Sequence, residues 1–145
     1  MIHSLLQRLL ATAPARLPEP DTRLALATLM VRIARTDGLY AVEEVEKIDK
    51  VLMQHFKLDP FEAARLRADA EDTETAAPDT VRFTRAIKDT TALEDRTALV
   101  QSLWSIALAD GYRDAQEDQQ LRLLASLLGL SDVDSALARQ RAEQQ

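Results

Sequence analysis

The sequence predicts an all-α protein, a compact bundle of about seven or eight helices, and three observations support this. Ala, Leu, Arg, Glu and Gln, which all favour helix, dominate the 145 residues. No stretch alternates apolar and polar side chains as a half-buried strand would. Only three glycines occur, and each lies at the expected end of a helix.

Composition limits the function before any motif is considered. The net charge of −6 and the isoelectric point near 4.9 argue against nucleic acid as a main partner. Cysteine is absent, which excludes disulfides, thiolate metal sites and cysteine nucleophiles. No apolar run is long enough for membrane insertion, and the N-terminus lacks the basic region of a signal peptide. We therefore expect a cytoplasmic protein of one domain, as a monomer or a homodimer.

The first half begins with a short amphipathic helix and a proline-marked loop over residues 1–20. The next helix starts near Asp21 and is apolar on most faces as far as Ala34, which predicts a buried central helix that ends at Gly38. An amphipathic helix follows. Its apolar stripe is formed by Val42, Val45, Ile48, Val51, Leu52 and Phe56.

A further helix is expected to start at Asp59, which with Glu62 has the spacing of a capping box. Phe61 and Leu66 are apolar positions of this helix. It is predicted to fade into the acidic stretch from Asp69 to Glu74, and the segment from Asp69 to Asp79 is expected to be a solvated acidic connection.

The second half is predicted to repeat this order. Pro78 opens a short helix with Phe83 and Ile87, and Thr91 with Glu94 has capping-box spacing before a second mostly apolar helix. A leucine-striped helix and a last helix follow. Gly111 ends the second apolar helix, Asp114 begins the leucine-striped helix and Gly129 ends it, and Ser131 begins the last helix.

A short string, D-G-x5-E, occurs twice and suggests that the domain consists of two related halves, 21–77 and 78–145. This predicts an internal pseudo-two-fold repeat. The matching positions are Asp37, Gly38 and Glu44 in the first copy, and Asp110, Gly111 and Glu117 in the second.

Two interpretations of this string stay open. In the structural one, the glycines end helices and Glu44 and Glu117, each at the third position of the next helix, bond free backbone N–H groups. In the other, Asp37, Glu44, Asp110 and Glu117 hold Ca²⁺ or another divalent cation if the two turns converge. A true EF-hand is excluded. Residues that cannot ligate stand at its first two ligand positions, namely Ile33, Arg35, Ile106 and Leu108.

Catalysis is not expected. The only histidines are His3 and His55, and the chain has no Gly-rich phosphate loop and no nucleophile with a base to activate it. As an alternative to cation binding, the chain is an interaction module whose acidic surface docks a basic protein partner. Glu71, Asp72 and Glu74 are the candidates for that surface.

The apolar helix ending in Asp-Gly, the Glu that completes D-G-x5-E and the following Leu-rich helix resemble the TerB-like (tellurite-resistance TerB) proteins of bacteria, above all the small standalone ones. The resemblance covers residues from Leu24 to Phe61 and from Leu93 to Leu137. It implies a bundle with internal pseudo-symmetry, an acidic metal-binding surface built from the motif acids, and a role in stress response.

Overall fold

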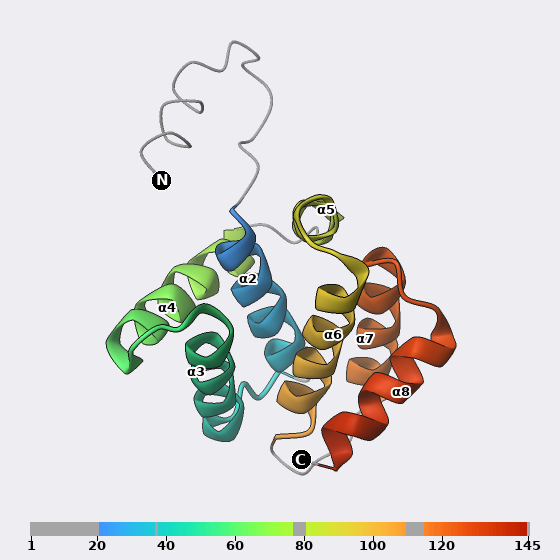
Figure 1. The fold of residues 1–145 in the computed structure, drawn as a ribbon. Coiled ribbons are helices and arrows are strands. Elements are labelled where there is room, and N and C mark those ends of the chain that lie inside the picture. The colour runs from blue at the N-terminus through green and yellow to red at the C-terminus, as the bar shows by residue number, and fades with distance from the viewer. Residues whose placement is uncertain (1–20, 37, 77–80, 110–114, 145) are drawn as a thin grey trace.

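The computed structural model describes residues 21–36, 38–76, 81–109 and 115–144. These residues form seven helices and no strand, which confirms the all-α prediction (Figure 1). The helix expected within residues 1–20 lies outside this range, and the internal repeat stays a prediction. The helices are α2 (Thr22–Arg35), α3 (Val42–Phe56), α4 (Pro60–Ala76), α5 (Val81–Thr90), α6 (Leu93–Ala107), α7 (Ala115–Leu127) and α8 (Asp132–Glu143).

Helix α2 is the buried centre of the bundle, as predicted. It begins at Asp21, whose Oδ1 accepts a hydrogen bond from the Leu24 backbone N–H at 3.0 Å. Every residue from Ala25 to Val31 is buried, and α2 contacts α3, α4, α5, α6 and α7. A helix with apolar side chains on most of its faces requires such an enclosed position.

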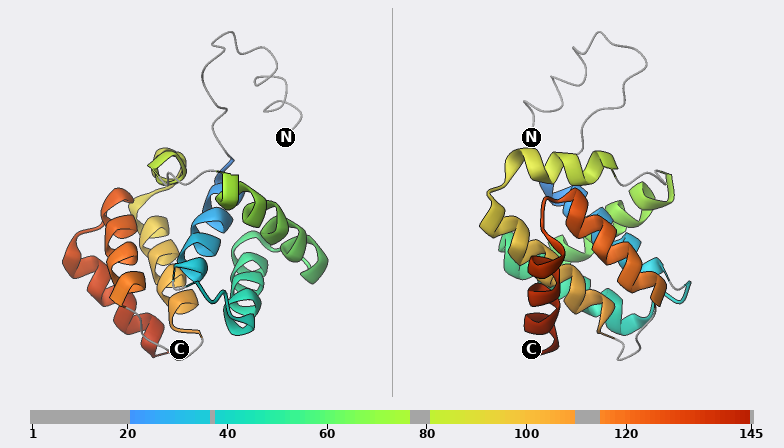
Figure 2. Two further views of the ribbon diagram at one scale, coloured as in Figure 1. Left: turned by 180° about the vertical axis from the view of Figure 1, so that it is seen from behind. Right: turned by 90° about the vertical axis from the view of Figure 1, so that its right-hand side faces the viewer.

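Two long helix pairings organise the rest of the fold. Helix α2 packs most extensively on α4, and α6 packs most extensively on α8. Helices α2 and α6 also contact each other and run in the same direction (Figures 1 and 2). Helix α5 lies across the end of the bundle at which α2 and α6 begin (Figure 2). As a result, α2 and α6 both finish at the opposite end.

One continuous apolar core joins all seven helices. Trp104 is the largest of its fully buried side chains, and Phe83 of α5 has no exposed surface. Among the described residues, none of the helices has both the length and the apolar character that a membrane span requires.

Helix α4 corrects two predictions. It does not fade into an acidic connection at Asp69, but continues to Ala76. Its buried residues are Ala63 and Ala70, whereas Phe61 is 78% exposed. Small side chains two turns apart let α4 lie close against its neighbours, and this close packing decides which face is buried. The prediction for α3 is wrong at Val42 for the same reason. The sequence pattern assigns Val42 to the apolar stripe because its side chain is apolar, but it is 63% exposed.

The predicted helix starts are confirmed at two sites and wrong at a third. Asp59 and Glu62 form both bonds of a capping box, at 3.1 and 2.7 Å, and Ser131 Oγ caps α8. Thr91 does not cap α6, which begins after Ala92 without a side-chain cap. Only two residues separate α5 from α6, and the Thr91 hydroxyl instead donates to the Ile87 carbonyl at the end of α5, at 2.5 Å.

Gly38 and Gly129 adopt left-handed backbone conformations, with φ of +82° and +89°, as expected for residues that follow helix ends. Gly111 lies outside the described residues. A Cβ added at Gly38 would meet no atom within 4 Å. A Cβ added at Gly129 would lie 3.0 Å from Arg96 Nη1, which donates to the Leu128 carbonyl.

We expect Gly38→Ala and Gly129→Ala to differ in their cost. Each places an L side chain in the left-handed region, which destabilises the fold by about 1–2 kcal/mol. Gly129→Ala should lose more than Gly38→Ala, because it also displaces Arg96 from the end of α7. Urea denaturation of both variants measures the difference, and equal losses would contradict a structural role for the Arg96 contact.

Candidate functional site

The first D-G turn joins α2 to α3 and is described except for Asp37. Helix α2 ends at Arg35, Gly38 takes its left-handed conformation, and Tyr40 also has positive φ, at 40°. The N-cap position of α3 is Ala41, which offers no side-chain acceptor. The first free N–H groups of α3 therefore depend on another residue.

Glu44 supplies part of that cap. Its side chain is fully buried, and its Oε1 accepts a hydrogen bond from the Ala41 backbone N–H at 3.0 Å. A carboxylate at the third position of a helix is also stabilised by the positive end of the helix dipole. This confirms the structural role predicted for Glu44, while its role as a cation ligand stays a prediction.

The second copy is described only at its edges. Asp110, Gly111 and the side chain of Glu117 lie outside the described residues, so the acids of the two turns cannot be compared directly. The ends of the helices that lead into the turns can be compared. Because α2 and α6 run in the same direction, their C-terminal ends lie at the same end of the bundle (Figures 1 and 2).

Cation ligands in the described part of the chain do not suffice for a site by themselves. No cluster of three or more His, Asp or Glu side chains with metal-binding geometry occurs there. Of the four candidate ligands, only the Glu44 side chain is described. A cation site at this end of the bundle therefore depends on Asp37, Asp110 and Glu117.

Tyr40 fixes the first turn to α4. Its hydroxyl donates a short hydrogen bond to Glu71, and the guanidinium of Arg35 lies 5.1 Å from the centre of its ring. Burial raises the pKa of Tyr40 above its ordinary value, and the bond to Glu71 raises it further. Arg67 completes the cluster by bonding Glu71 at 3.0 Å and Asp49 of α3 at 2.6 Å.

A second cluster ties the end of α2 to the end of α4. Arg32 and Arg35 bond the two carboxylate oxygens of Glu74 at 3.1 and 2.8 Å. Arg35 also donates to the Glu71 carbonyl at 3.1 Å and to the Thr75 hydroxyl at 3.0 Å. Glu71 and Glu74 therefore pair with arginines of the same chain, whereas Asp72 is exposed, and the docking of a basic partner on these acids stays a prediction.

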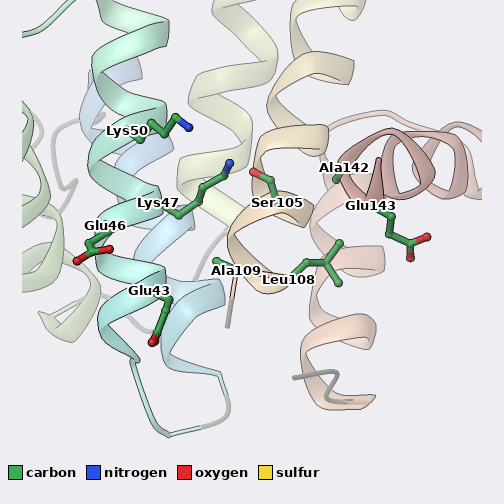
Figure 3. A pocket seen from close by; sticks show the side chains of 9 residues that line it. All are labelled: Glu43, Glu46, Lys47, Lys50, Ser105, Leu108, Ala109, Ala142 and Glu143. Atoms are coloured by element: carbon green, nitrogen blue, oxygen red, sulfur yellow. The ribbon is translucent and has the colours of Figure 1, made fainter. Parts of the chain in front are cut away.

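A groove of about 610 Å³ opens between α3, α6 and α8 (Figure 3). Its lining on α3 begins at Glu43, just after the first turn, and its lining beyond the end of α6 reaches Ala109, which precedes the second turn in the sequence. Lys47 and Lys50 extend from α3 toward α6, whereas Glu46 points away (Figure 3). The groove therefore adjoins both copies of the motif and carries charges of both signs.

His55 has no catalytic surroundings. Its Nε2 lies 2.9 Å from the Ser102 hydroxyl, and no carboxylate bonds its ring in the described part of the chain. Burial lowers the pKa of His55, and the charge of Asp95 opposes this shift. His55 thus joins α3 to α6 at the surface through its hydrogen bond with Ser102.

Comparison with known proteins decides the family. The family model described as "Tellurite resistance protein TerB" matches residues 23–140. The chain belongs to the TerB family. No curated protein and no solved structure matched it.

In this TerB domain the matched region includes all seven described helices except for the ends of α2 and α8. The sequence carries a signal for the ion pairs between α2 and α4 that the prediction of a solvated acidic connection overlooked. Arg32 and Arg35 are charged residues at the end of a buried helix, and such residues need acidic partners. The acid-rich stretch around Glu71 and Glu74 has no bases of its own and provides those partners.

Proposed function

We propose that this TerB domain is a non-enzymatic binding module that contributes to tellurite resistance and related stress responses of a bacterium. The family match over residues 23–140 supports this role. Its working surface is the end of the bundle where α2 and α6 terminate, because each of these helices is followed in the sequence by Asp-Gly.

The proposed ligand is a divalent cation, with Ca²⁺ as the first candidate. The observation that carries this proposal is the common direction of α2 and α6, since antiparallel helices would hold the two motif copies at opposite ends. Ca²⁺ takes about six to eight oxygen ligands. One turn offers too few, so the site requires both turns. Its ligands are Asp37, Glu44, Asp110 and Glu117, together with backbone carbonyls and water.

We expect millimolar Ca²⁺ to raise the melting temperature of the wild type, and the double variant Asp37→Asn/Asp110→Asn to abolish that rise. A ligand at one hundred times its Kd stabilises the folded state by about 2.7 kcal/mol, which corresponds to several degrees. Scanning calorimetry with Ca²⁺, Mg²⁺, Mn²⁺ and Zn²⁺ in turn measures the effect. The matched control is Asp69→Asn/Asp72→Asn, which removes two exposed carboxylates of α4.

No rise with any of these ions would contradict cation binding. It would favour the alternative function, in which the motif acids are helix caps and exposed acids dock a basic protein partner. The Glu44 cap supports that alternative. A second measurement tests the physiological role: in a tellurite-sensitive strain that lacks the gene, the control variant should restore growth on tellurite and the Asp37→Asn/Asp110→Asn variant should not.

A further inference from the structure

Three buried polar groups gather where α6, α7 and α8 meet. They are the indole N–H of Trp104, the hydroxyl of Ser135 and the ε N–H of Arg139, and none of them has a hydrogen-bond partner in the described structure. Trp104 is only 2% exposed and Ser135 only 4%. A buried donor without an acceptor destabilises the fold, so such a cluster calls for an acceptor that occupies the site.

The same three residues line a cavity of about 230 Å³ together with Arg122, Asp132 and Ala136. One water molecule fills about 30 Å³, so the cavity has room for a small polyatomic ion and its remaining water. The charged lining consists of two guanidinium groups and one carboxylate. Glu143, which pairs with Arg139 at 3.4 Å, adds a second carboxylate beside the cavity, so the two guanidinium groups are balanced as long as that pair is closed.

Arg139 links the cluster to the surface of α8 through two contacts. Its guanidinium carbon lies 5.7 Å from the centre of the Trp104 ring, and its ε nitrogen pairs with Glu143 at 3.4 Å. Glu143 is 43% exposed, so this pair contributes little to stability. The Trp104 indole nitrogen, the Ser135 hydroxyl oxygen and the Arg139 ε nitrogen are shielded from solvent.

We propose that this cavity binds a small oxyanion of the phosphate or sulfate class. Arg139 and Arg122 supply the positive charge, and the Trp104 N–H and Ser135 hydroxyl donate to the oxyanion oxygens. Hydrogen bonds to an ionised group are stronger than hydrogen bonds between neutral groups. The donors come from several residues around the cavity, and a phosphate or sulfate ion has acceptor oxygens that point in several directions. This inference does not rest on the cation site, which involves other residues.

Trp104 is the only tryptophan of the chain, so its fluorescence reports on the site directly. Titration of the full chain with inorganic phosphate or sulfate should change the fluorescence with saturation and raise the melting temperature. Sodium chloride at matched ionic strength should do neither. Arg139→Leu should weaken binding by about tenfold or more. The control Arg141→Leu removes the same charge from an exposed position of α8 outside the cavity, and it should leave binding unchanged.

Two further variants keep the test independent of folding defects in Arg139→Leu. Glu143→Gln releases Arg139 from its ion pair and should strengthen binding by about two- to fivefold. Trp104→Phe retains an aromatic ring without the N–H, and it should reduce the stabilisation by phosphate in calorimetry. An equal response to chloride, or equal losses in Arg139→Leu and Arg141→Leu, would overturn the proposal.

Discussion

Glu71→Lys is expected to destabilise the domain by about 2–3 kcal/mol. The carboxylate accepts bonds from the Tyr40 hydroxyl and from Arg67, and its side chain is 23% exposed. An ammonium group in its place loses both bonds and faces the guanidinium of Arg67. The partial exposure keeps the effect below that of a fully buried pair. Urea denaturation followed by circular dichroism measures the loss.

Asp72→Lys provides the matched control, since it makes the same change of charge on the next residue of α4. Asp72 is exposed and takes part in no ion pair of the described structure, so we expect its free energy of unfolding to stay within about 0.5 kcal/mol of the wild type. Glu71→Gln should lie between the two variants, because it retains a hydrogen-bond acceptor for Tyr40. Equal free energies of unfolding for Glu71→Lys and Asp72→Lys would mean that the contacts of Glu71 do not hold α4 against the first turn.

Local chemistry explains what the sequence predicted correctly. The caps at Asp59 and Ser131 and the glycines after α2 and α7 depend on residues within one turn of each other. Such signals can be read without knowledge of tertiary contacts. The Thr91 cap failed because an equally local bond, to the carbonyl of Ile87, competes for the same hydroxyl.

The buried face of α4 could not be predicted from such local signals. Its buried residues are the small Ala63 and Ala70, and which face of α4 is buried depends on how this helix packs on α2 and α3. Similarly, Glu74 pairs with arginines about forty positions earlier in the chain. The charges of both partners are visible in the sequence, but their pairing depends on the packing of α4 on α2. The sequence pattern therefore assigns Glu71 and Glu74 to a solvated surface together with the exposed Asp72, although both pair with arginines of α2 and α4.

For the candidate cation site, the sequence predicts which residues are involved but not whether they lie close together. The repeated motif identifies Asp37, Glu44, Asp110 and Glu117, and the buried position of Glu44 agrees with its predicted cap. The donors at Trp104 and Arg139 had no sequence signal at all. They come from different helices, and each residue taken alone fits an ordinary packing position.

Phe83→Ala is expected to have the largest effect of any substitution considered, a loss of about 3–5 kcal/mol. The ring is fully buried, and α5 packs on α2 on one side and on α7 on the other. Removal of the ring leaves a cavity in the contact that holds α5 across the end of the bundle. For a domain of this size the melting temperature should fall by about 10 °C.

Two companion variants identify the cause of that loss. Phe83→Leu leaves a smaller cavity and should cost less than Phe83→Ala, whereas Val81→Ala removes methyl groups from a side chain that is already 40% exposed and should cost little. Because α5 contacts one helix from each half of the chain, the destabilised domain should still unfold in a single transition. Two separate transitions in calorimetry would mean that the halves around α2 and α6 are independent units, and that α5 is not what couples them.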